Sequence, residues 1–105
     1  MQIQTNTDRN IAGSEALTAK ANAIVEAALA RFSDQITRVE LHLSDENGAR
    51  GGAEDKRCMM EARLEGRQPI AVTHHAATVE QALHGAADKL KQSIESTLGR
   101  RRDSQ

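Results

Sequence analysis

The spacing of apolar residues changes twice along the 105-residue chain, and these changes constrain the fold more than any other feature. Between residues 14 and 32, apolar residues recur every three or four positions, as on one side of a helix. Within three segments between residues 37 and 76 they recur every second position, as in strands buried on one face. After Thr78 the helical spacing returns and continues to Leu98. The pattern predicts three strands between two amphipathic helices.

Local signals place the ends of these segments. Ser14 precedes the first helical stripe and can accept hydrogen bonds from the first free backbone amides of that helix. Thr78 and Gln81 form the Thr-x-x-Gln pattern of a capping box at the start of the second helix. Gly99 follows the last apolar position of this helix and is predicted to end it. The alternation in "MQIQT" at the N-terminus predicts one further strand.

The predicted element order is β-α-β-β-β-α, which is an α+β fold. We expect an antiparallel four-stranded sheet, because three of the strands follow one another directly. Each helix has one apolar stripe, so both helices are predicted to pack on one face of the sheet. We expect a single domain over residues 1–99 and a basic C-terminal tail over residues 100–105. The glycine-rich segment "DENGARGGAED" is predicted to be a mobile hairpin loop.

The composition limits the core and the setting. Phe32 is the only Phe, Tyr or Trp residue, so aliphatic side chains must fill the core, and a homodimer would add stability. Cys58 is the only cysteine, which excludes an intramolecular disulfide and favours a reducing, cytoplasmic location. No segment approaches the roughly 18 to 20 apolar residues that a membrane span requires. We therefore expect an unexported protein without a membrane partner.

Signals for catalysis and metal binding are weak. The sequence contains no glycine-rich phosphate loop, GxSxG elbow or HExxH helix, so we expect no enzyme activity and no cofactor. His74 and His75 are adjacent on a predicted strand and should point to opposite faces, which argues against a shared metal. Cys58 alternates in phase with Met60 and Ala62 and is predicted to be a core residue. Four acidic residues flank the glycine-rich loop without EF-hand spacing and are expected to be solvated: Asp45, Glu46, Glu54 and Asp55.

The charge distribution points to one local basic cluster. The formal net charge of −1 argues against a polycation that coats nucleic acid by bulk charge. Residues 78–105 nevertheless carry five basic and four acidic residues. Lys89 and Arg100 lie on one helical stripe away from the apolar face, with Lys91 to one side. These cations either complement the helix macrodipole and keep the surface soluble, or bind an anionic partner.

The segment "ALHGAADKLKQSI" resembles the last helix of the ribosome hibernation-promoting and ribosome-associated inhibitor family, also called sigma-54 modulation proteins. Asp88, Lys89 and Leu90 match the Asp-Lys-Leu of that family, and Thr78 stands where an Asp caps its last helix. "MQIQ" and "NIAGSEAL" look like the first strand of the family and the start of its first helix. The predicted β-α-β-β-β-α order is also the order of the family's fold. The chain is expected to be a divergent short form without the additional dimerisation domain of long members.

The resemblance implies a function and favours the anion-binding interpretation. Members of this family bind the small ribosomal subunit under stress, in the channel used by messenger and transfer RNA, and block translation sterically. We predict contacts to ribosomal RNA phosphates from seven residues: Lys89, Lys91, Arg100, Arg101, Arg102, Lys20 and Arg31. Lower-ranked candidates lie on the outward face of the predicted sheet: Arg38, Arg57 and Arg63.

Other features favour a second hypothesis. The net charge of −1, the acidic hairpin segment and a first helix with few basic residues fit a non-catalytic protein-interaction or dimeric stress-response module. Such a module would keep the fold but would have lost ribosome binding. The two hypotheses predict different partners, ribosomal RNA in the first case and proteins in the second.

Overall fold

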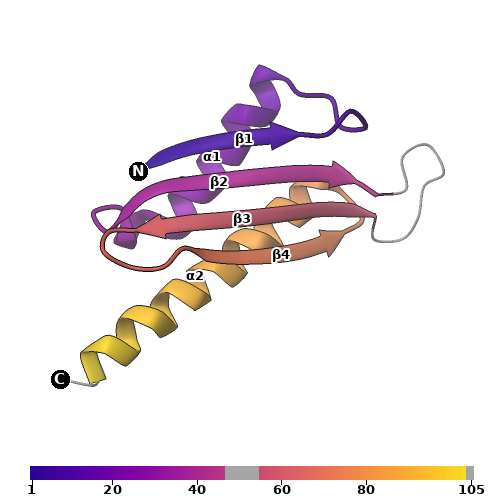
Figure 1. Ribbon diagram of the computed structural model, residues 1–105. Coiled ribbons are helices and arrows are strands. Elements are labelled where there is room, and N and C mark those ends of the chain that lie inside the picture. Colours follow the sequence, from indigo (N-terminus) through magenta and orange to yellow (C-terminus); the bar gives the residue numbers. More distant parts are fainter. Residues whose placement is uncertain (47–54, 104–105) are drawn as a thin grey trace.

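The computed structural model describes residues 1–46 and 55–103, with backbone only for residues 100–103. Its elements follow the predicted order, and Figure 1 shows their arrangement: β1 (Gln2–Thr7), α1 (Glu15–Leu29), the 3-10 turn η1 (Ala30–Phe32), β2 (Ile36–Asp45), β3 (Lys56–Leu64), β4 (Ile70–Ala76) and α2 (Val79–Asp103). The segment predicted to be a mobile hairpin loop falls largely on residues 47–54, which lie outside the described residues.

The four strands form one sheet in the order β1-β2-β3-β4. β2 pairs antiparallel with β3, and β3 pairs antiparallel with β4, as predicted. The prediction of an entirely antiparallel sheet was wrong, because β1 pairs parallel with β2. The reason is the helix between them: α1 carries the chain back to the end of the sheet where β1 started, so both strands run in the same direction.

Both helices pack on one face of the sheet, as predicted, and leave the other face open (Figure 1). The core lies between the two layers and is aliphatic, since Phe32 at the end of η1 is its single aromatic ring. The alternation in the strands and the helical stripes meet there, with fully buried side chains from both layers: Val39, Leu41, Cys58, Met60, Ala62, Ala21, Val25, Leu29, Leu83, Leu90 and Ile94.

The predicted helix starts are confirmed. The hydroxyl of Ser14 accepts a hydrogen bond of 3.1 Å from the backbone N–H of Leu17 at the start of α1. The hydroxyl of Thr78 accepts one of 3.1 Å from the N–H of Gln81 at the start of α2. No helix in the described part of the chain is both long and apolar enough to cross a membrane.

The prediction that Gly99 ends the last helix was wrong. α2 continues to Asp103, so the backbone of Arg100, Arg101 and Arg102 remains helical. A glycine ends a helix by adopting a left-handed conformation, and among the described residues only Gly66 has a positive φ. The domain boundary after residue 99 stays a prediction. The consequence for the shape is that α2 extends well past the strands (Figure 1).

Near its start, α2 approaches β4 closely. A Cβ atom placed on Gly85 would lie only 2.0 Å from the ring of His74, so this contact requires a glycine. His74 is the cross-strand partner of Cys58 on the helix-covered face, whereas His75 pairs with Arg57 on the open face. The prediction that the two histidines point to opposite faces is therefore confirmed.

Candidate nucleic-acid interface

The predicted basic residues of the first helical region are bound to carboxylates of α2. The Lys20 ammonium lies 3.3 Å from Glu80, near the start of α2. The Arg31 guanidinium lies 4.0 Å from Glu95 and stacks over the ring of Phe32 at 5.1 Å from its centroid. All four charged side chains are exposed, so each pair contributes at most about 1 kcal/mol. These pairs link the first helical region to α2. Because they are weak, Lys20 and Arg31 can still release the carboxylate and bind another anion.

The two predicted lysines of α2 do not act together. Lys89 donates a hydrogen bond of 2.9 Å to the backbone carbonyl of Thr73 on the edge strand β4. Lys91 forms no hydrogen bond or ion pair within the described part of the chain. Residues two positions apart in a helix are roughly 200° apart around its axis, so the ammonium groups of Lys89 and Lys91 face different sides of α2. Lys89 covers an exposed sheet edge, and Lys91 is the freer of the two.

The three predicted arginines occupy the end of α2. Their backbone belongs to the segment that extends past the sheet, while their side chains lie outside the described residues. Arg31 lines a cavity of about 220 Å³ together with Glu95, Leu98 and Gly99, which form the turn of α2 just before the three arginines. The structure therefore brings Arg31 close to the base of the arginine segment. Lys20, at the other end of the helix pair, is not part of this group.

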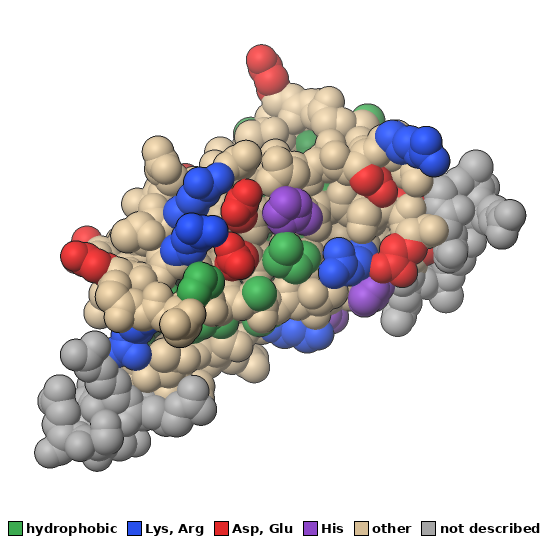
Figure 2. Space-filling view, in the orientation of Figure 1, with side chains coloured by type: hydrophobic (Ala, Val, Ile, Leu, Met, Phe, Trp, Pro, Cys, Tyr) green, Lys and Arg blue, Asp and Glu red, His purple; other side chains and the backbone are tan. Residues whose placement is uncertain are grey.

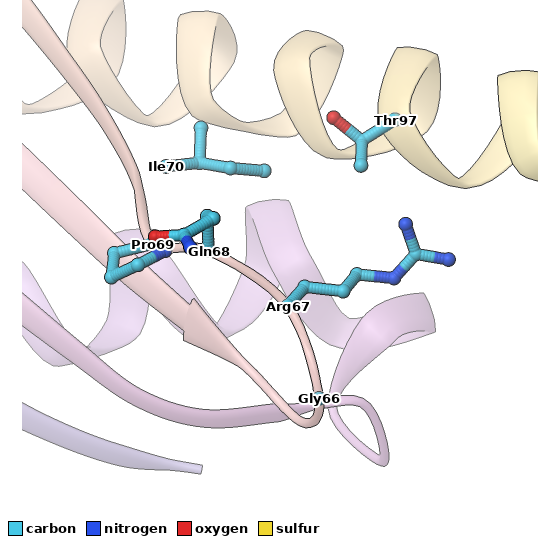
Figure 3. A pocket seen from close by; sticks show the side chains of 6 residues that line it. All are labelled: Gly66, Arg67, Gln68, Pro69, Ile70 and Thr97. Atoms are coloured by element: carbon cyan, nitrogen blue, oxygen red, sulfur yellow. The ribbon is translucent and has the colours of Figure 1, made fainter.

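A further cation beside this end of α2 was missed in the sequence. Arg67 lies in the turn between β3 and β4, directly after Gly66, whose φ of 73° makes that turn. Its side chain extends toward α2 below Thr97 in Figure 3. Gly66, Arg67 and Thr97 line a groove of about 720 Å³ with three neighbours of the turn: Gln68, Pro69 and Ile70. Turn residues belong to no periodic stripe, so only the "GRQP" turn sequence itself could have drawn attention to this arginine.

The lower-ranked arginines lie on the open face of the sheet, and each of the three has a carboxylate beside it (Figure 2). Arg38 and Arg63 face each other across β2 and β3, and so do Glu40 and Glu61 two register positions further along, on the same face. Each arginine pairs along its own strand, Arg38 with Glu40 and Arg63 with Glu61, both at 3.5 Å. This part of the open face is therefore electrically balanced.

The third arginine of the open face is matched in the same way. Arg57 lies 3.7 Å from Glu46, and the ring of His75 contacts the same carboxylate at 3.1 Å. Glu46 follows the end of β2, whereas Arg57 and His75 belong to β3 and β4. One carboxylate thus connects three strands of the sheet and offsets the positive charge at this end.

No group of three or more His, Cys, Asp and Glu side chains within residues 1–46 and 55–103 is placed to hold a metal ion. Asp45 and Asp55, from the acidic segment, are buried rather than solvated as expected, and both contact Lys56, at 3.3 and 2.9 Å. The hydrogen bond from the Lys56 ammonium lowers the pKa of the Asp55 carboxyl. Glu46 is exposed, and Glu54 lies outside the described residues.

Cys58 is a core residue, as predicted. It is fully buried on the helix-covered face of β3, and this burial raises the pKa of its thiol to about 12. A nucleophilic cysteine needs a lowered pKa, so the environment of Cys58 is the opposite of a reactive site.

Comparisons with known proteins agree with this architecture. The family model described as "Sigma 54 modulation protein / S30EA ribosomal protein" matches residues 5–102. No curated protein gave a match. Among solved structures, the N-terminal domain of Thermus thermophilus Protein Y is similar with a TM-score of 0.74 and 19% identity, over 92% of this chain and 99% of that one. A ribosomal subunit interface protein from Coxiella burnetii is similar with a TM-score of 0.72 and 17% identity, over 94% and 99%. At such identities the structural likeness shows a shared fold.

Proposed function

Because the chain belongs to the sigma-54 modulation / S30EA ribosomal protein family, a family of ribosome-associated factors, we propose that it is a ribosome hibernation factor. It binds the small ribosomal subunit through phosphates of ribosomal RNA, blocks translation sterically and performs no chemistry of its own. The observation that carries this proposal is the family match over residues 5–102, nearly the whole chain. Such a factor acts in the cytoplasm, where the ribosomes are.

The geometry supports an RNA contact at the end of α2. Arg100, Arg101 and Arg102 continue a helix that extends past the sheet, and Arg31 lies beside the base of this segment. A projecting helix can approach an RNA backbone without the rest of the domain colliding with it. Phosphate contacts of this kind orient a protein without reading sequence. Lys91 adds charge along α2, whereas Lys20, Arg31 and Lys89 contribute less because each already has a partner.

The proposal is tested by cosedimentation of the purified protein with isolated small ribosomal subunits at increasing salt. Binding at low salt should weaken steeply, because the logarithm of the association constant falls by roughly 0.7 to 0.9 per phosphate contact for each unit of log salt. Isolated large subunits serve as the control and should retain less protein. Absence of binding to small subunits at low salt, or binding that salt does not change, would overturn the proposal.

One observation favours the second candidate, a protein-interaction or dimeric stress-response module. Several cations that the family resemblance makes candidates are ion-paired, including Lys20, Arg31 and the three arginines of the open face. Affinity capture from nuclease-treated lysate separates the two functions: protein partners retained without ribosomal RNA favour the module. Analytical ultracentrifugation would show whether the chain forms a homodimer.

A further inference from the structure

Charge pairing distinguishes Arg67 from most other cations of this protein. Most Lys and Arg side chains that the structure describes form an ion pair with a carboxylate. Arg67 forms neither an ion pair nor a side-chain hydrogen bond within residues 1–46 and 55–103. Its side chain nevertheless does not extend freely into solvent, because it is partly buried along the groove next to α2 (Figure 3). A partly desolvated guanidinium without a counterion favours binding of an anion.

The chemistry of the groove fits an oxyanion. The guanidinium of Arg67 is the charged donor of the groove, and Gln68 and Thr97 add polar side chains to its lining. None of the described residues that line the groove is acidic. The nearest acidic neighbour in sequence, Glu65, lines a second cavity of about 220 Å³ that Arg67 also lines. A planar guanidinium that can bind two oxygen atoms at once is well suited to a phosphate.

The position of the groove on α2 favours a phosphate within a polymer. Helix positions 100 and 101 lie three and four residues beyond Thr97 and therefore on the same side of α2, about one turn or 5.4 Å further along. Both positions are arginines. A strand that leaves the groove along the helix meets these positions next. Pro69 and Ile70 add apolar surface against which a sugar can pack.

We propose that Arg67 binds one backbone phosphate of ribosomal RNA in the groove between the β3–β4 turn and α2. This inference rests on the proposed function and adds a contact that connects the turn to the arginine segment. Arg67 sets the position of the strand, and the helix end guides its direction.

The test compares Arg67→Ala with Arg9→Ala, a matched control that removes the same charge. Arg9 is exposed, forms no ion pair within the described residues and lies at the opposite end of the sheet. Dissociation constants for isolated small subunits are measured at several salt concentrations. Arg67→Ala should weaken binding about tenfold and reduce the salt slope by roughly 0.7 to 0.9, the share of one phosphate. Arg9→Ala should leave the slope unchanged.

Two further variants separate charge from structure. Arg67→Lys should restore the salt slope but bind more weakly than the native chain, because an ammonium lacks the paired donors of a guanidinium. Glu65→Gln, which removes the nearby negative charge, should tighten binding. Since Arg67 has no side-chain partner in the described structure, thermal unfolding of the variants should match that of the native chain.

The outcomes distinguish this inference from the proposed function. If the native chain does not bind small subunits, both are wrong. If the native chain binds and Arg67→Ala shows the native salt slope, the groove contact alone is wrong. Inorganic phosphate, titrated against the native chain without ribosomes, should bind only weakly. Submillimolar binding that Arg67→Ala abolishes would identify a site for free phosphate and overturn the assignment to RNA.

Discussion

The two halves of α2 differ in almost every respect although they form one continuous helix. Residues 79–94 lie on the sheet, where Leu83, Leu90 and Ile94 are fully buried and Gly85 touches a histidine ring. Residues 95–103 leave the sheet, and Leu98 is only partly buried. Burial of the first half fixes the direction of the second half, because a helix transmits orientation along its axis. Packing on the sheet thus holds the positively charged end of α2 in a fixed, projecting orientation.

The largest expected effect comes from truncating one leucine in each half. Leu90→Ala should lower the free energy of unfolding by about 2–5 kcal/mol, since it leaves a cavity in the core. Leu98→Ala should cost about 1 kcal/mol, because this side chain is partly exposed. Urea unfolding followed by circular dichroism measures both values. Equal losses would mean that the end of α2 is as firmly packed as its start.

The second prediction concerns the charges of the projecting half. Changing Arg100, Arg101 and Arg102 together to Glu should weaken binding to small subunits on the order of 100-fold or more at about 0.1 M salt, because several phosphate contacts are replaced by repulsion. The stability should change little, since these positions lie beyond the sheet. Unchanged cosedimentation would show that the helix end does not contact RNA.

A charge-neutral variant of the open sheet face is the control for this triple change. It replaces two arginines and their paired carboxylates by glutamine, at Arg38, Glu40, Glu61 and Arg63. Because each removed cation takes its own carboxylate with it, the net charge stays constant and binding should remain within about twofold of the native value. A loss comparable to that of the helix-end variant would place the RNA contact on the sheet instead.

Much of the fold was predictable because burying one face of an element imposes a period on its sequence. The inward residues of β3, from Cys58 to Leu64, follow directly from this alternation. The direction of β1 does not, because alternation is the same in parallel and antiparallel strands. The prediction that the last helix ends at Gly99 was wrong for a related reason. A glycine permits a left-handed turn but does not require one, and the following arginines favour helix.

The site was less predictable than the fold. The sequence indicated which residues are basic but not which of them find a carboxylate in the folded chain. Lys20 meets Glu80, and Arg31 meets Glu95, across 60 and 64 positions of sequence, because the two helices pack side by side. Arg67 escaped notice since its importance comes from the neighbouring helix. Tertiary packing decides these relations, and no local pattern encodes them.

The third prediction uses the glycines of the two halves. Gly85→Ala should destabilise the fold by about 1 kcal/mol, because the new methyl group collides with the ring of His74, which must move. Gly99→Ala should stabilise it by up to about 1 kcal/mol, because the position is helical and has open space around it. Thermal unfolding midpoints measure both shifts. A stabilising Gly85→Ala would contradict the close packing of α2 on β4.

The smallest expected effect is on the rate at which a thiol reagent labels Cys58, which reports how firmly α2 packs on the sheet. Cys58 lies beneath the first half of the helix, and burial raises the pKa of its thiol to about 12. At pH 8 only about one thiol in 10⁴ is then ionised in the folded chain, so a thiol reagent should label Cys58 through local opening. The labelling rate should rise with pH and level off above about pH 9, once the thiol exposed by opening is ionised. A rate that keeps rising toward pH 12 would mean that the folded state itself reacts.

The same rate distinguishes the two halves in the variants. Leu90→Ala and Gly85→Ala weaken the contact of α2 with the sheet, so both should accelerate labelling of Cys58. Leu98→Ala and Gly99→Ala act beyond that contact and should leave the rate nearly unchanged. If all four variants accelerated labelling equally, α2 would open as one unit. The projecting half would then share the stability of the sheet, and its freedom to approach RNA would depend on the opening of the whole helix.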